Sequence, residues 1–133
     1  MPAGLIVEVS GLDGLPAVVA HPRGLALVFS NLLENAADAM GGAGRVRISG
    51  STRRGWVEVT VSDSGPGIPA ELQERIFELS FSGRRPGRAG KLGFGLWWVR
   101  TMMTRLGGTI SVASDGQHGT SFVLRLPCAE GVP

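Results

Sequence analysis

The sequence predicts an α/β domain, because segments with the two-residue period of strands alternate with segments that have the 3.6-residue period of helices. The strand-like alternation is clearest in residues 45–51 and 56–62. The helical periodicity is clearest in residues 23–40 and 96–106. Because a chain of 133 residues supports one hydrophobic core, we expect a single domain over residues 1–133.

The composition is that of a globular protein, with 43% apolar and 18% charged residues. The sequence has no apolar run long enough to span a bilayer and no charged-then-apolar leader, so we expect no membrane contact by this domain and a cytoplasmic location. The single cysteine, Cys128, cannot form an internal disulfide, which is typical of a reducing compartment. A net charge of +2 is too small to indicate nucleic-acid binding by itself.

Two short strand-like segments open the chain. Residues 5–9 and 16–20 are rich in apolar side chains, and the turn-forming residues 11–14 lie between them. This order predicts that the two strands pair as a hairpin at an edge of the sheet. His21 and Pro22 then end the second strand and open the first helix.

The helix predicted at residues 23–40 has an apolar face and, beside it, a polar line. The apolar arc predicts the core face and contains Leu25, Val28, Phe29, Leu32, Leu33, Ala36, Ala39 and Met40. Asn31, Asn35 and Asp38 form a narrow arc next to it, with Glu34 at its margin. Because a surface helix normally places polar residues opposite its apolar arc, we expect this line to face a polar group. The alternative is that the two asparagines only cap the helix or hydrogen-bond in the core.

A glycine-rich turn follows the strand predicted at residues 56–62, with the sequence Asp63-Ser-Gly-Pro-Gly-Ile-Pro69. Gly65 and Gly67 have no Cβ, which lets a flat ring lie close to the backbone, and Ile68 adds an apolar wall. A buried Asp that accepts a hydrogen bond from an exocyclic amine distinguishes adenine from guanine. The turn therefore indicates either the floor of a nucleotide site or a plain strand-turn-helix connection with Asp63 as the cap. A helix is predicted next, at residues 70–77.

The second half of the chain contains a basic segment between two ordered parts. Residues 83–91 have little apolar content, which predicts a mobile loop with the charges Arg84, Arg85, Arg88 and Lys91. No aromatic residues interleave with these charges, which disfavours binding of single-stranded nucleic acid. The following helix has the core stripe Leu96, Val99, Met102, Met103 and Leu106, and two strands at residues 109–114 and 120–126 close the chain. Trp97 lies off that stripe. It is expected either to be exposed, as a contact to a partner or to a lid formed by the basic loop, or to pack under that loop. His21 and His118 are expected to be ordinary turn histidines.

The order of these elements resembles the ATP-binding catalytic domain of sensor histidine kinases, within the gyrase, heat-shock chaperone and mismatch-repair ATPase superfamily. Residues 31–39 match the family's N box, residues 63–69 the G1 box, residues 76–81 the F box and residues 93–96 the G2 box. Gly119-Thr-Ser-Phe122 matches the closing strand motif. The resemblance implies a two-layer α/β sandwich, a mixed sheet with helices on one face, which is the Bergerat-type ATP-binding fold.

The resemblance also implies the site residues and the cofactors, ATP and Mg²⁺. Asn35 is expected to bind Mg²⁺, Asp63 to accept from adenine and Thr120 to reach the base through water. Asn31, Asn35 and Lys91 are the expected catalytic residues. The expected ATP-binding residues are Asn31, Asn35, Asp38, Asp63, Gly65, Gly67, Ile68, Lys91, Gly93, Phe94, Gly95, Leu96 and Thr120.

The sequence departs from the family pattern at several places, among them Trp97 and Trp98, which replace residues that are usually small or aliphatic. Asp38 stands where the family often has a phosphate-contacting cation, so another cation must face the triphosphate. Leu79 or Ser80 replaces the proline of the F box, and Leu92 replaces the threonine before the G2 box.

The implied reaction is transfer of the ATP γ-phosphoryl group to a histidine. We expect that histidine on the dimerisation helical hairpin of the same or a partner kinase, with a response regulator downstream and no nucleic acid as partner. Hydrolysing superfamily members carry Glu at the position of Asn31, so slow hydrolysis is expected. The alternatives are an anti-sigma-factor-type serine kinase and a nucleotide-binding module without catalysis.

Overall fold

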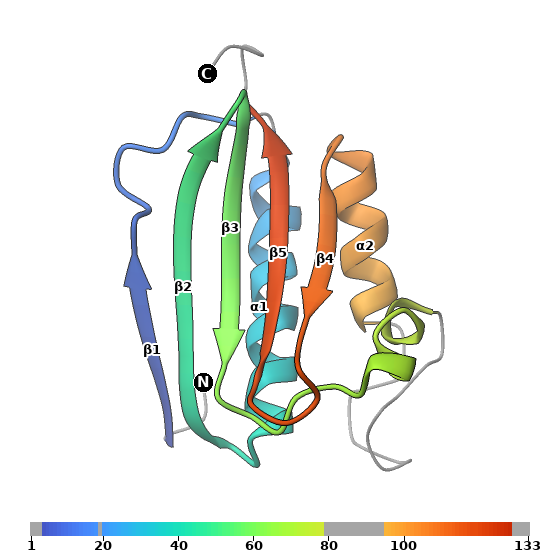
Figure 1. The fold of residues 1–133 in the computed structure, drawn as a ribbon. Coiled ribbons are helices and arrows are strands. Elements are labelled where there is room, and N and C mark those ends of the chain that lie inside the picture. The colour runs from blue at the N-terminus through green and yellow to red at the C-terminus, as the bar shows by residue number, and fades with distance from the viewer. Residues whose placement is uncertain (1–3, 19, 79–94, 129–133) are drawn as a thin grey trace.

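The computed structural model describes residues 4–18, 20–78 and 95–128, which form a five-stranded sheet with helices packed on one face (Figure 1). The elements in chain order are β1 (Gly4–Ser10), α1 (Pro22–Ala39), β2 (Ala43–Arg53), β3 (Trp56–Asp63), the short 3₁₀ helices η1 (Ala70–Leu72) and η2 (Arg75–Phe77), α2 (Gly95–Arg105), β4 (Thr109–Ala113) and β5 (Thr120–Pro127). In the part of the chain that the structure describes, no helix is long and apolar enough to cross a membrane.

The sheet is mixed, with the strand order β1-β2-β3-β5-β4. β1 lies parallel to β2, and the other neighbouring pairs are antiparallel. A two-residue turn joins β2 to β3, and both of its residues, Arg54 and Gly55, have positive φ. The predicted two-layer arrangement, a mixed sheet with helices on one face, is confirmed.

The predicted hairpin between residues 5–9 and 16–20 is wrong. β1 is an edge strand, as expected, but its partner is β2, which it reaches through the α1 crossover. Among the described residues of the second segment, Val18 makes an isolated bridge to Cys128 and packs against the core. The apolar character of this segment therefore reflects packing at the end of the core. Pro16, which lacks a backbone N–H, is poorly suited to a ladder there.

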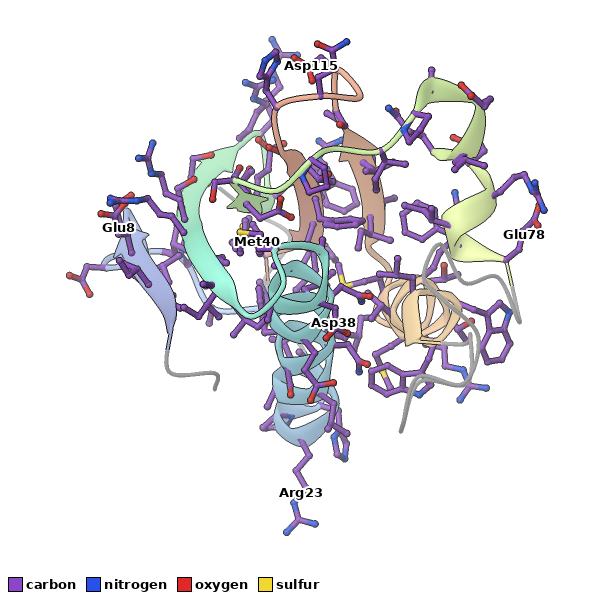
Figure 2. The ribbon with its side chains drawn as sticks, turned by 90° about the horizontal axis from the view of Figure 1, so that it is seen from below. Glu8, Arg23, Asp38, Met40, Glu78 and Asp115 are labelled. Atoms are coloured by element: carbon purple, nitrogen blue, oxygen red, sulfur yellow. The ribbon has the colours of Figure 1, made fainter. Side chains whose placement is uncertain are left out.

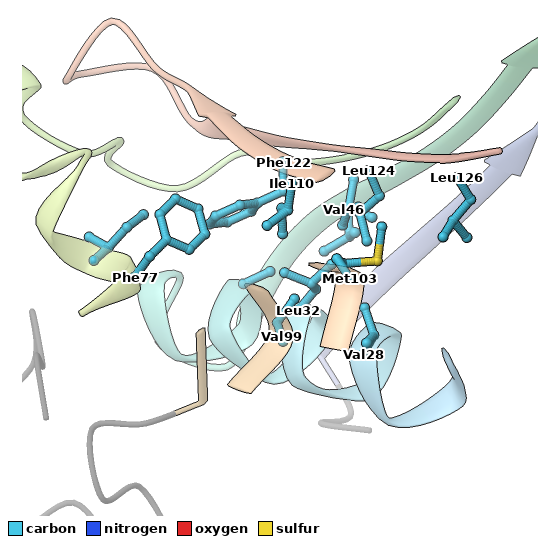
Figure 3. Packing of buried hydrophobic residues seen from close by; sticks show 13 residues of the cluster. Val28, Leu32, Val46, Phe77, Val99, Met103, Ile110, Phe122, Leu124 and Leu126 are labelled. Carbon is cyan, nitrogen blue, oxygen red and sulfur yellow. The ribbon is translucent and has the colours of Figure 1, made fainter. Parts of the chain in front are cut away.

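The core lies between the sheet and the two helices (Figure 3). Val28 and Leu32 of α1 and Val99 and Met103 of α2 are at most 1% exposed. Phe77 packs edge-on against Phe122, with ring centroids 6.3 Å apart. The helical periodicity thus identified the faces that meet the sheet.

Two predictions about helices need correction. Ala39 was assigned to the core face of α1 but is exposed, whereas Ala37 is buried, because α1 ends at Ala39 and the chain turns away there. The helix predicted at residues 70–77 is instead the pair of 3₁₀ helices η1 and η2. Ile76 and Phe77, both in η2, are buried in the core.

His21 has a structural role that the sequence did not indicate, since its Nδ1 accepts a hydrogen bond from the Gly24 N–H at 3.1 Å and caps α1. We expect His21→Ala to lower the free energy of unfolding by about 0.5–2 kcal/mol, because the first turn loses a cap acceptor. Chemical denaturation measures this change. The control His21→Asn keeps a cap acceptor and should stay close to the parent. An equal loss in both variants would contradict the capping role.

Candidate nucleotide-binding site

Asp63 lies where the sheet ends, as the last residue of β3 and the ladder partner of Thr120, the first residue of β5. Its Oδ1 accepts a hydrogen bond from the Gly65 N–H at 2.9 Å. Burial raises the pKa of the Asp63 carboxyl above its ordinary value of 3.8, and the backbone N–H groups of Gly65 and Thr120 oppose that rise. The structure thus brings Asp63, Gly65 and Thr120 together, as the sequence predicted, around a partly desolvated carboxyl group.

The turn after Asp63 passes very close to neighbouring chain segments. A Cβ on Gly65 would lie 3.0 Å from Asp63 Oδ1 and 3.3 Å from Met40 Cγ, so this turn touches the end of α1. Gly67 has φ +86°, and a Cβ there would lie 2.8 Å from both the Gln117 N atom and Ser114 Oγ. Glycine is therefore required at position 67 for both its backbone conformation and its close contacts.

We call residues 63–69 the Asp63 turn. The polar line on α1, formed by Asn31, Asn35 and Asp38, runs from this turn toward the start of α2. Asn31 Nδ2 donates to the Leu27 carbonyl at 2.9 Å, and Asn35 Nδ2 donates to the Asn31 carbonyl at 3.0 Å. These bonds use the amide nitrogens, and they direct the amide oxygens away from the helix backbone. Figure 2 shows Asp38 on the side of α1 that faces α2. The line is about 10 Å long at 1.5 Å per residue.

The N-terminus of α2 lies at the other end of that line. A Cβ on Gly95, the first residue of α2, would be only 3.3 Å from Asn31 Oδ1. The unpaired backbone N–H groups of a helix N-terminus attract anions, and α2 is long enough to offer them. Leu96 is partly buried against the core, which fixes the direction in which this terminus points.

Two further residues hold the Asp63 turn in place, and the sequence did not single them out. Ser114 Oγ accepts a hydrogen bond from the Ile68 N–H at 2.9 Å, and Gln73 Nε2 donates to the Ile68 carbonyl at 2.9 Å. Ser114 follows a strand and precedes a turn, which is a typical place for serine, but nothing local connects it with Ile68. The contact spans 46 residues of sequence.

A family model for "Histidine kinase-, DNA gyrase B-, and HSP90-like ATPase" matches residues 20–130. This chain belongs to that family. It is 40% identical over 119 residues to the adaptive-response sensory kinase SasA of Synechococcus sp. (strain CC9902), covering 88% of this chain and 31% of the relative. It is 37% identical over 115 residues to the sensor histidine kinase ZraS of Escherichia coli (strain K12), covering 86% and 24%. The chain thus spans a third or less of the length of these relatives.

Solved structures show the same likeness. The mycobacterial sensor histidine kinase MprB superposes with a TM-score of 0.81 at 28% identity, covering 96% of this chain and 86% of that one. Full-length ShkA in complex with AMPPNP superposes with a TM-score of 0.79 at 27% identity, covering 95% of this chain and 26% of that one. This chain is therefore similar to the ATP-binding catalytic domains of sensor histidine kinases. The similarity confirms the resemblance drawn from the sequence. It also supports ATP as the nucleotide of this domain.

Some expected parts of this ATPase domain lie outside the described residues. They are the end of the F box from residue 79, the basic loop at residues 83–91, and the site residues Lys91, Gly93 and Phe94. Within residues 4–18, 20–78 and 95–128, no group of three or more His, Cys, Asp or Glu side chains is arranged to hold a metal ion. Trp97 is 39% exposed, in keeping with its position off the core stripe.

In the hairpin loop between β4 and β5, an aspartate and a histidine side chain are hydrogen-bonded. His118 Nδ1 lies 2.7 Å from Asp115 Oδ2, and the Gln117 and His118 N–H groups donate to Asp115 Oδ1. The His118 side chain, followed by these backbone N–H groups, lowers the pKa of Asp115 to about 2. His118 is thus a turn histidine, as predicted, with an acidic partner.

Proposed function

We propose that this domain binds ATP with Mg²⁺ and transfers the γ-phosphoryl group to a histidine on a separate dimerisation hairpin, in the cytoplasm. The hairpin belongs to the same or a partner kinase, and a response regulator acts downstream. One observation carries the proposal: the Asp63 turn, the polar line of α1 and the N-terminus of α2 form a continuous row. Such a row offers a base contact, a metal ligand and a phosphate site in the order of the parts of a nucleotide.

At the base end, Asp63 accepts a hydrogen bond from the exocyclic amine of adenine. A carboxylate has about four acceptor positions, and the Gly65 N–H takes one of them on Oδ1. Guanine would direct a carbonyl oxygen toward the same carboxylate, so adenine is preferred. Thr120, beside Asp63 in the ladder, supports a water that reaches the base. Ile68, partly buried, supplies the apolar wall.

In the middle of the row, Asn35 holds Mg²⁺ through its amide oxygen. The Asn35 amide nitrogen donates to the Asn31 carbonyl, so the amide oxygen points away from the helix backbone. This orientation fits a metal ligand. One amide oxygen suits Mg²⁺, which usually keeps waters and phosphate oxygens as its other ligands. When bound, the ion neutralises charge on the phosphates. Asp38, three residues after Asn35 in α1, continues the polar row on the side of the helix that faces α2.

At the phosphate end, backbone N–H groups at the start of α2 receive phosphate oxygens. We assign this contact to residues 93–96, of which Gly95 and Leu96 begin α2. The cation that faces the triphosphate is assigned to Lys91, the only lysine of the chain. The roles proposed for Lys91, Gly93 and Phe94 rest on the family resemblance. Asn31 lies against Gly95 and orients this end of the row.

The isolated domain is expected to bind ATP but to hydrolyse it slowly. Asn31 stands one helical turn before Asn35, and an amide cannot take a proton from water, so a general-base contribution of about 10²–10⁴-fold is missing. Self-phosphorylation is not expected either, because His21 caps α1 and His118 is held by Asp115 in the last hairpin.

Incubation with Mg·ATP, with and without a dimeric histidine hairpin from a relative of this kinase type, tests the function. The chain alone should release little phosphate and carry no acid-labile label, and the added hairpin should become labelled. Rapid phosphate release by the chain alone, abolished by Asn35→Ala, would place it among the hydrolases instead. Acid-stable label on an added substrate protein would favour a serine kinase.

A further inference from the structure

The Asp63 turn is attached to the β4–β5 hairpin loop by hydrogen bonds from the side chains of Ser114 and Gln73. The Ser114 hydroxyl accepts from the Ile68 N–H at 2.9 Å and from the Gly116 N–H at 3.0 Å, and it donates to the Gly119 carbonyl at 2.8 Å. A serine hydroxyl has one donor and two acceptor positions, so all three are occupied. Ser114 therefore joins the turn to both ends of the hairpin loop.

Gln73 holds the same turn from the other side. Its Nε2 donates to the Ile68 carbonyl at 2.9 Å and to the Ser114 carbonyl at 3.0 Å, which uses both protons of the amide. Ile68 consequently has its N–H held by Ser114 and its carbonyl held by Gln73. The position of Ile68 is thus set by two side chains that lie on different elements.

Close backbone contacts make this arrangement tight. A Cβ on Gly119, which has φ +90°, would collide with the Asp63 carbonyl oxygen, so the hairpin loop also touches the start of the turn. The turn is held at Asp63 by one glycine contact and at Ile68 by the two side chains. Neither Ser114 nor Gln73 has a hydrogen bond to the Asp63 carboxyl among the described contacts.

We propose that Gln73 and Ser114 are positioning residues for adenine, which fix the distance between the Ile68 wall and the Asp63 carboxylate. The inference rests on the proposed function, because it assumes that the base lies between these two residues. We call Ser114 and Gln73, with their bonds to Ile68, the clamp. Since the clamp acts only on the base end of the row, it changes the affinity for every adenine nucleotide equally. It leaves the metal and phosphate contacts unchanged.

The variants Ser114→Ala and Gln73→Glu test the proposal. Each removes at least one hydrogen bond to Ile68, and a carboxylate in place of the Gln73 amide cannot donate to either carbonyl. We expect ADP without metal and Mg·ATP to lose affinity by the same factor, about three- to tenfold. With a histidine hairpin as acceptor, the KM for ATP should rise by that factor and kcat should stay unchanged. Ser114→Thr, which keeps the hydroxyl, should restore most of the affinity.

Matched controls are available on the same hairpin. Ser111→Ala and Gln117→Glu change exposed side chains of the same types and should leave the affinity unchanged. Hydrogen exchange of the Ile68 amide, measured without nucleotide, should be faster in Ser114→Ala than in Ser111→Ala. If Ser114→Ala does not fold, Gln73→Glu against its control Gln117→Glu provides the same comparison.

Two outcomes overturn the inference in different ways. Faster exchange at Ile68 with unchanged affinity for both nucleotides would make the clamp purely structural and would leave the proposed function intact. Failure of the unmodified chain to bind ADP would overturn the proposed function and this inference together. A loss for Mg·ATP that greatly exceeds the loss for ADP would place the two residues at the phosphate end and would also overturn the proposal.

Discussion

Asp63→Asn is expected to weaken ATP binding by about 10- to 150-fold, the effect of losing a charged hydrogen bond of about 1.5–3 kcal/mol. The amide is nearly isosteric, but it turns a donor toward the adenine amine or offers only a neutral acceptor. Titration calorimetry measures the change. Unchanged ATP affinity in a folded Asp63→Asn variant would rule out Asp63 as the adenine acceptor.

The same substitution should not lower stability. Because burial raises the pKa of Asp63, the folded state binds the proton more tightly than the unfolded state, so ionisation of this group costs stability above its ordinary pKa of 3.8. Removing the charge therefore leaves Asp63→Asn at least as stable as the parent at pH 7. Thermal unfolding without nucleotide should therefore show no loss of Tm in this variant, although calorimetry shows a loss of ATP affinity.

Asp115→Asn provides a control of the opposite sign. The pKa of Asp115 is lowered from 3.8 to about 2, so its charge contributes stability that is present above pH 4 and is lost as the pH falls toward 2. Its replacement should slightly lower stability at pH 7 and leave ATP affinity unchanged. A loss of ATP affinity in both variants would indicate a general effect of charge at this end of the molecule.

Asn35→Ala is expected to weaken Mg·ATP far more than metal-free ATP. Loss of residues that only support metal ligands changes metal affinity by about 10–100-fold, and loss of the ligand itself should reach at least that range. The bond from Asn35 Nδ2 to the Asn31 carbonyl is lost too, but alanine is the better helix former, so α1 should remain folded.

Calorimetry with and without Mg²⁺ checks the effect of Asn35→Ala. Ser30→Ala, an exposed position on the same helix, is the matched control and should change neither affinity. Equal losses with and without Mg²⁺ would mean that Asn35 supports the helix and does not hold the metal.

The sequence predicted those features that repeat locally or form a motif. Alternation located β2, β3 and β5, and the helical period found Val28 and Leu32 as core residues. The partner of β1 was predicted incorrectly, because strand pairing depends on the α1 crossover and leaves no trace in the strand's own pattern. The same limit hid the role of Ser114, since its bond to the Ile68 N–H joins residues 46 apart in the chain.

The antiparallel pairing of Asp63 with Thr120 also has a consequence for folding. β2 and β3 are joined by a two-residue turn, so their hairpin closes a very short loop and is expected to form early. By contrast, the β3–β5 ladder must close a loop of more than fifty residues, and the entropy of that closure is lost before its contacts form. The base end of the row is therefore assembled late in folding. Recovery of adenine binding during refolding should follow the last step of folding, whereas β2–β3 hairpin signals should appear before it.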